Sequence, residues 1–225
     1  MKIVIILALI VFIPIIVSKF LNLIISIIYR HQQLIPFVTG EQARDVIETF
    51  LYRNNLSIPI RISQGSLTDS YDPHKNILYL SETTYYSNSV AAYAIGLHEV
   101  GHALQVRDHY MPQEIRIVLH PISILILLIT FIAAVFSLTG NTIAITITII
   151  FLSIYIIIQL STIKAEINAS QRALDMLITI EGITGNDLEN CKHVLKLAYW
   201  TYIIQSIANL SVIFFLLAAA GNKKQ

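Results

Sequence analysis

Residues 143–163 read IAITITIIFLSIYIIIQLSTI, without a single charged side chain. A helix needs about 20 apolar residues to cross a bilayer. Isoleucine and threonine favour strands in water, but in lipid a helix satisfies its own backbone hydrogen bonds. The run therefore predicts a membrane-spanning helix.

Three further apolar runs, at residues 3–28, 115–136 and 199–220, are long enough to cross a membrane in the same way. Of the 225 residues, 55% are hydrophobic and only 13% are charged, whereas a soluble domain carries about 25% charged residues. The mean hydropathy is +0.68. We expect a mainly α, polytopic membrane protein with about four transmembrane helices. The first run lacks a small-residue cleavage site, which favours a retained anchor over a removed signal peptide.

Four spans divide the rest of the chain between two sides of the membrane. Residues 29–114 and 164–198 fall on one side, and the termini and the turn at 137–142 fall on the other. Most lysines and arginines lie on the first side, which the positive-inside rule assigns to the cytoplasm. We predict a multi-pass plasma-membrane protein, organised as a single domain over residues 1–225, with its polar regions in the cytoplasm.

Charge and cysteine content exclude other classes of protein. The net charge of +1 gives no sign of a nucleic-acid surface. The single cysteine, Cys191, excludes an intramolecular disulfide and a metal site built from cysteines. Any metal site in this chain therefore has to use histidine or carboxylate ligands.

The first polar region, residues 29–114, indicates a small α/β unit. An amphipathic helix is expected up to Asn54, and residues 57–64 alternate as a strand does. A turn at 72–76 precedes a second strand at Ile77–Leu80, so a β-hairpin is expected. A longer helix should follow, from Asn88 to Arg107.

That last helix contains the motif His98-Glu99-Val100-Gly101-His102. Residues four apart lie on one helical face, so His98 and His102 can bind the same zinc ion. Glu99 lies beside them, where it can take a proton from a water that zinc polarises and pass it to the leaving amine. The motif predicts a zinc metallopeptidase with one Zn²⁺ per chain, His98 and His102 as ligands, and Glu99 as the catalytic base.

A catalytic zinc has three protein ligands and an open position, and Glu166 is the best candidate for the third ligand. It lies at the polar end of the 143–163 run, where a carboxylate is costly without a partner. The small residues Ala169 and Ser170 share its helical face and would let the zinc helix approach. The alternative is an interfacial carboxylate paired with Lys164 or Arg172. The other candidate ligands on the same side are Asp69, Asp72, His74, Asp108, His109, His120, Asp175 and His193.

Three motifs in order, at residues 67–73, 98–105 and 166–173, make the chain resemble the YugP-type family of bacterial membrane zinc metallopeptidases. The resemblance extends over nearly the whole chain. It implies that Glu166 is the third ligand, as in the gluzincin-like peptidases, and that the fold is similar to that of membrane heat-shock proteases. Those proteases carry an aspartate at the position of Ser170, and it orients a zinc-bound histidine. Ser170, Asn168 or Asp69 would have to replace that support.

The resemblance and the motif together predict an endopeptidase that cleaves membrane or membrane-proximal proteins. Its partners would be a protein or peptide substrate and the lipid bilayer. The alternative is a proteolytically inactive, zinc-stabilised membrane scaffold, although such a protein would not need Glu99. In related peptidases an edge strand pairs with the substrate, and Ile77–Leu80 is predicted to do so here, with an ordinary hairpin strand as the alternative. Tyr71 and Arg172 are candidates for stabilising the transition state.

Overall fold

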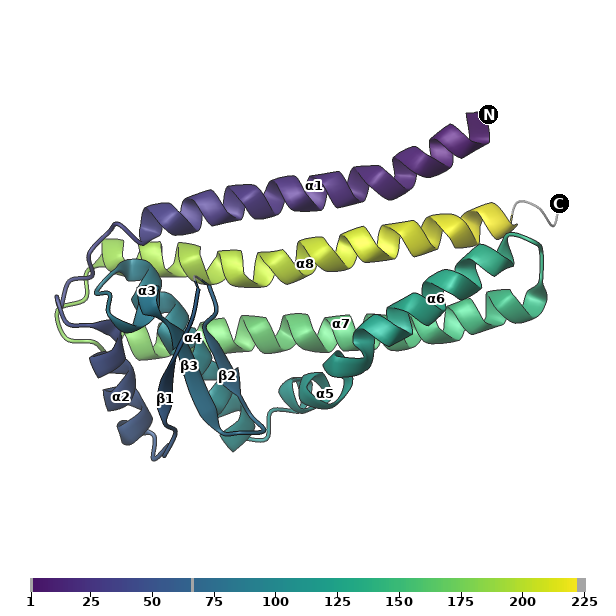
Figure 1. Ribbon diagram of the computed structural model, residues 1–225. Coiled ribbons are helices and arrows are strands. Elements are labelled where there is room, and N and C mark those ends of the chain that lie inside the picture. The colour runs from purple at the N-terminus through teal and green to yellow at the C-terminus, as the bar shows by residue number, and fades with distance from the viewer. Residues whose placement is uncertain (1, 66, 222–225) are drawn as a thin grey trace. The chain divides into compact units, whose positions relative to one another are not determined.

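The computed structural model describes residues 2–65 and 67–221, with side chains from residue 16 onwards. Helices make up most of this part of the chain (Figure 1), and the bounds of every element follow from the backbone. The helices are α1 (Lys2–Gln32), α2 (Ala43–Arg53), α3 (Glu82–Tyr85), α4 (Val90–Arg107), α5 (Met111–Leu119), η1 (His120–Ile122), α6 (Ser123–Ser137), α7 (Thr142–Leu177) and α8 (Gly185–Gly221). The strands are β1 (Ile60–Ser63), β2 (Ser70–Asp72) and β3 (Ile77–Ser81).

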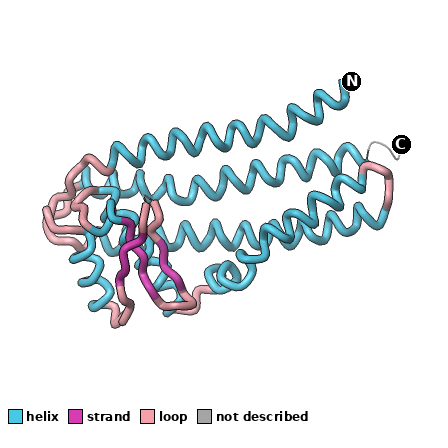
Figure 2. The backbone as a smooth tube through the Cα atoms, in the orientation of Figure 1, coloured by secondary structure: helices cyan, strands magenta, loops and turns pink. Residues whose placement is uncertain are grey.

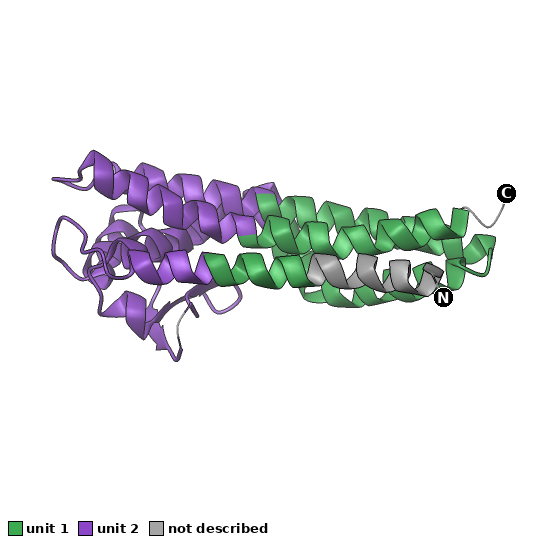
Figure 3. Ribbon diagram, turned by 90° about the horizontal axis from the view of Figure 1, so that it is seen from above, with its two compact units in different colours: residues 1–24, 115–163, 201–225 green, residues 25–114, 164–200 purple. Residues whose placement is uncertain are grey.

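The chain divides into two compact units (Figure 3). Unit 1 comprises residues 1–24, 115–163 and 201–225, and unit 2 comprises residues 25–114 and 164–200. The bounds of unit 2 nearly coincide with the polar regions 29–114 and 164–198 that the sequence assigns to one side of the membrane. Since α1, α7 and α8 each contribute residues to both units, the predicted connector at 164–198 consists of the end of α7, a short loop and the start of α8.

Three stretches within the described residues are long and apolar enough to cross a membrane. They are Met111–Ser137, Thr142–Leu177 and Gly185–Gly221, and they contain the predicted spans at 115–136, 143–163 and 199–220. The other predicted span, at 3–28, is helical as part of α1. The side chains of residues 1–15 lie outside the described part, so membrane crossing by this helix stays a prediction.

Inside unit 1, polar side chains join α7 and α8 among buried apolar residues. Asn209 donates from Nδ2 to the Tyr155 hydroxyl at 2.8 Å, and Ser206 donates to Oε1 of Gln159 at 2.8 Å. Side-chain hydrogen bonds of this kind hold helices together in lipid, where the hydrophobic effect does not act between them.

Unit 2 contains a three-stranded sheet, the strands of which are drawn in magenta in Figure 2. The strand order is β1-β3-β2, with β1 parallel and β2 antiparallel to β3. The predicted hairpin exists, but it joins β2 to β3, while the strand predicted at 57–64 runs parallel to β3. The prediction that Ile77–Leu80 is an edge strand is wrong, because β3 is the central strand. Ser70–Asp72 was not recognised as a strand because it is too short and polar to show an alternating pattern.

α4 forms the core of unit 2 and carries the predicted metal motif. Apart from Ile95, every side chain from Val90 to Gln105 is buried, and the helix packs against α2, α3 and the sheet. Its first turn is capped by Ser89, whose hydroxyl accepts a hydrogen bond from the Ala92 N–H. Because burying polar groups is costly unless they find partners, the polar side chains of this helix point to a functional site.

Candidate metal centre

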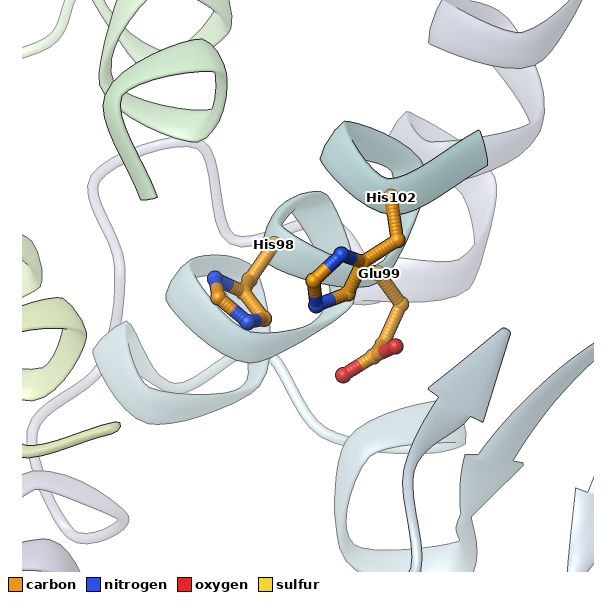
Figure 4. A group of neighbouring side chains, drawn as sticks. All are labelled: His98, Glu99 and His102. Carbon is orange, nitrogen blue, oxygen red and sulfur yellow. The ribbon is translucent and has the colours of Figure 1, made fainter. Parts of the chain in front are cut away.

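Three polar side chains of α4 converge inside unit 2 (Figure 4). His98, Glu99 and His102 place potential ligand atoms within 4.8 Å of one another, and they form a group that could hold a metal ion. The two imidazole rings lie edge to face with their centroids 4.7 Å apart. The helical spacing of four residues therefore brings both histidines together, as the sequence predicted.

Glu166 of α7 contacts both histidines. Its Oε2 lies 3.1 Å from Nε2 of His98, and its Oε1 lies 3.6 Å from Nε2 of His102. The residue is only 2% exposed. One carboxylate thus faces the same nitrogen of each ring, although 68 residues separate it from His98 in the chain.

A close approach of the two helices brings Glu166 to this position. At Gly101 an added Cβ would lie 2.6 Å from the backbone oxygen of Ala169, so only glycine fits there without a shift of the backbone. Ala169 itself is fully buried. Since Ala169 lies three residues after Glu166, the same helical face carries the contact and the carboxylate.

The second ring nitrogen of each histidine also has a polar neighbour. Nδ1 of His98 lies 3.2 Å from Oγ of Ser170, and Nδ1 of His102 lies 2.9 Å from Oε1 of Gln105. Ser170 was one of three residues expected to support a histidine. Gln105 was missed, although its position three residues after His102 places it on the same face of α4.

Glu99 is held away from the Glu166 carboxylate by the sheet. Its Oε2 accepts a hydrogen bond of 2.9 Å from the backbone N–H of Tyr71 in β2. The nearby Asp69 carboxylate accepts from the backbone and hydroxyl of Ser81. Burial, together with a smaller contribution from the charge of Glu99, raises the pKa of Asp69 above its usual value.

The structure gives several other sequence candidates different partners. Asp72 accepts hydrogen bonds from the backbone of the turn that follows it, and His109 contacts Glu114. Arg172 forms an ion pair with Asp108 and donates to Asn168, and the Tyr71 hydroxyl donates to Asn76. None of these groups belongs to the histidine cluster in the described residues.

The donor set fits zinc. Two imidazole nitrogens and a carboxylate are the ligands found in catalytic zinc sites of the His₂Glu type. Here a carboxylate that is almost wholly buried faces two Nε2 atoms, and each histidine has a polar partner at Nδ1, as zinc-bound histidines do.

Comparison with known proteins agrees with this chemistry. A family described as "Putative neutral zinc metallopeptidase" matches residues 4–221. The chain is also similar to "Putative membrane protease YugP" of Bacillus subtilis (strain 168), with 31% identity over 180 residues that cover 76% of this chain and 77% of that protein. No solved structure matches the chain. Because the family match extends over nearly the whole sequence, the resemblance read from the three motifs is confirmed, and this protein belongs to the neutral zinc metallopeptidase family, whose cofactor is Zn²⁺.

Proposed function

We propose that the protein is a membrane-embedded, zinc-dependent endopeptidase that hydrolyses peptide bonds of membrane or membrane-proximal proteins. The observation that carries the proposal is the placement of the Glu166 carboxylate against Nε2 of both His98 and His102. His98, His102 and Glu166 would then be the metal ligands, and Glu99 the general base.

The two carboxylates of the site differ in their surroundings, which supports this assignment of roles. Glu166 has one oxygen near each histidine and is 2% exposed. Glu99 has an oxygen tied to the Tyr71 N–H, and it follows His98 directly, so the helix turns it away from the shared face by about 100°. A base beside the metal, rather than bound to it, is what peptide hydrolysis requires.

Zinc, when bound, lowers the pKa of water and polarises the carbonyl of the substrate. Glu99 then takes a proton from the attacking water and delivers it to the leaving amine. Since the Tyr71 N–H already donates to Oε2, we assign this proton transfer to Oε1. Ser170 and Gln105 orient the two imidazoles from behind.

The class of substrate follows from where the site lies in the chain. Glu166 belongs to α7, which is also one of the candidate membrane spans. A site carried on a membrane helix acts on proteins at or near the bilayer. The positive-inside rule further predicts that the site faces the cytoplasm.

A test of the proposal compares detergent-purified native protein with Glu99→Gln and Glu166→Ala. Zinc content is measured by elemental mass spectrometry, and cleavage is measured on a library of unfolded membrane-protein segments. We expect zinc in the native protein and in Glu99→Gln, and its loss in Glu166→Ala. Cleavage should fall by a factor of at least about 10²–10⁴ in Glu99→Gln, because the base is gone while the metal stays.

The same measurement separates the peptidase from a zinc-stabilised scaffold. A native protein that holds zinc but cleaves nothing in the library would favour the scaffold. Full cleavage by Glu99→Gln would contradict the assigned mechanism, and undiminished zinc in Glu166→Ala would contradict the assigned ligand.

A further inference from the structure

Behind His102, a line of hydrogen bonds runs from α4 to α7. Nδ1 of His102 lies 2.9 Å from Oε1 of Gln105, which is fully buried. The amide nitrogen of Gln105 donates to the backbone oxygen of Ala165 at 2.7 Å and to Oδ1 of Asn168 at 3.0 Å. Both protons of the amide are therefore used.

The line continues from Asn168 towards the surface of unit 2. Nε of Arg172 donates to the same Oδ1 of Asn168 at 2.9 Å. Nη1 of Arg172 forms an ion pair of 2.5 Å with Asp108, and the side chain of Arg172 is 22% exposed. Arg107 and then Arg172 hold the pKa of Asp108 below its usual value, so Asp108 is charged at neutral pH and anchors the guanidinium.

The direction of every bond in this line is fixed by two groups that have no choice. A guanidinium only donates, so the atom of Asn168 that faces Arg172 must be its oxygen. A backbone carbonyl only accepts, so the atom of Gln105 that faces Ala165 must be its nitrogen. Neither amide can turn over without placing two donors or two acceptors against each other.

The fixed amide of Gln105 in turn determines which nitrogen of His102 carries the proton. Its oxygen accepts only, so Nδ1 of His102 has to donate. A neutral imidazole has one donor and one acceptor nitrogen, which leaves Nε2, the atom 3.6 Å from Glu166, with a lone pair for the metal.

We propose that Gln105, Asn168 and Arg172 are positioning residues that hold His102 in its Nδ1–H form, with Nε2 available to zinc. This inference rests on the proposed zinc site and adds residues that never touch the metal. Arg172 had been a candidate for the transition state. Its role here is to fix the orientation of an amide two contacts away from the ligand.

The test uses pairs of variants that keep or remove the direction of a bond. In Asn168→Asp the side chain keeps its shape and its accepting oxygens, whereas Asn168→Leu keeps the approximate size and loses them. Arg172→Lys keeps a donor-only cation, and Arg172→Met removes it. Gln105→Met removes the whole amide. Each full-length protein is purified in detergent, and its zinc dissociation constant is measured by competition with a chelator.

Zinc affinity should fall about 10–100-fold in Gln105→Met and in Asn168→Leu, the range found when a partner of a metal ligand is removed. In Asn168→Asp it should stay within about threefold of the native value, because only acceptance is needed at this position. Arg172→Lys should likewise retain more affinity than Arg172→Met. The absorption spectrum of Co²⁺-loaded protein should change in Asn168→Leu and not in Asn168→Asp, and the zinc-free proteins should unfold at similar temperatures.

Native affinity in Gln105→Met, or equal loss in Asn168→Asp and Asn168→Leu, would overturn the inference and leave the zinc site standing. If Gln105→Met does not fold, the Asn168 pair decides, since that residue is only half-buried. A native protein that binds no zinc would overturn the proposed function and this inference together.

Discussion

Gly101 lies next to His102 on α4, and a side chain there would meet the backbone of α7. An added Cβ would lie 2.6 Å from the carbonyl oxygen of Ala169 and 3.1 Å from its Cα. Backbone atoms cannot rotate away as the end of a side chain can, so the two helices would have to separate. The carboxylate of Glu166 would move with α7.

Gly101→Ala should therefore weaken both the fold and the metal site. We expect a loss of about 1–3 kcal/mol in the free energy of unfolding, as for overpacking in a core, together with reduced zinc content. The matched control is Gly185→Ala, where nothing lies within 4 Å of an added Cβ and stability should be unchanged or raised by less than about 1 kcal/mol. Unfolding in detergent and elemental analysis check both variants. Native zinc content in Gly101→Ala would contradict the close approach.

Asp69 predicts a pH dependence of stability. Burial raises its pKa in the folded protein, so the folded state binds this proton more tightly than the unfolded chain does. The free energy of unfolding therefore falls as the pH rises from about 4 through the raised pKa, and the full cost is present above it. Asp69→Asn lacks this term. In zinc-free protein the stability of the variant relative to the native chain should increase between pH 4 and 7, and a constant difference would be evidence against the buried charge.

The residues of the site were predictable to different degrees. His98, Glu99 and His102 lie on one helix, and helical periodicity alone places them together. Glu166 needed a second helix, and the sequence indicated it through a costly carboxylate flanked by small residues. Gln105 was missed because its significance comes from Ala165 and Asn168 of α7, and the sequence of one helix does not reveal what lies against it.

At the scale of elements, α7 must present three features on one face. Glu166 faces the histidines, Ala169 meets Gly101, and Ser170 contacts His98. An extra residue inside a helix rotates everything before it by about 100° relative to everything after it. The carboxylate therefore depends on an uninterrupted helix between residues 166 and 169.

One alanine inserted after Ile167 should turn Glu166 away and abolish zinc binding, while circular dichroism still shows a helical protein. The control is one alanine inserted after Gly182, in the loop between α7 and α8, where added length is tolerated. Zinc content close to native in the first insertion would contradict the role of the shared face.

The sheet shows where the sequence was insufficient. Ile77–Leu80 was recognised as a strand from its apolar run, but pairing decides whether a strand is central or at an edge. Leu78 donates to Pro59 on the side of β1, while β2 pairs along the other side. With only three residues, β2 is too short for a periodic signal, so the sequence indicated one partner of β3 and not the other.

At the scale of the whole molecule, the predicted topology places the 137–142 turn and the 72–76 turn on opposite sides of the membrane. The single cysteine of the chain, Cys191, is fully buried. In a Cys191→Ser background, Thr139→Cys should react with a membrane-impermeant maleimide in intact cells. Lys75→Cys should react only after permeabilisation, since Lys75 is exposed but predicted to be cytoplasmic. The reverse pattern would contradict the orientation.

The donors of the metal site are separated in the chain by two candidate membrane spans, because His98 and His102 precede Met111–Ser137 and Glu166 follows the apolar part of α7. A ribosome delivers the chain from its N-terminus, so both histidines are made well before the carboxylate. Throughout that interval the nascent protein has an incomplete set of donors. The protein is therefore synthesised as its own zymogen, without a propeptide, and translocation of the helical hairpin is the step that activates it.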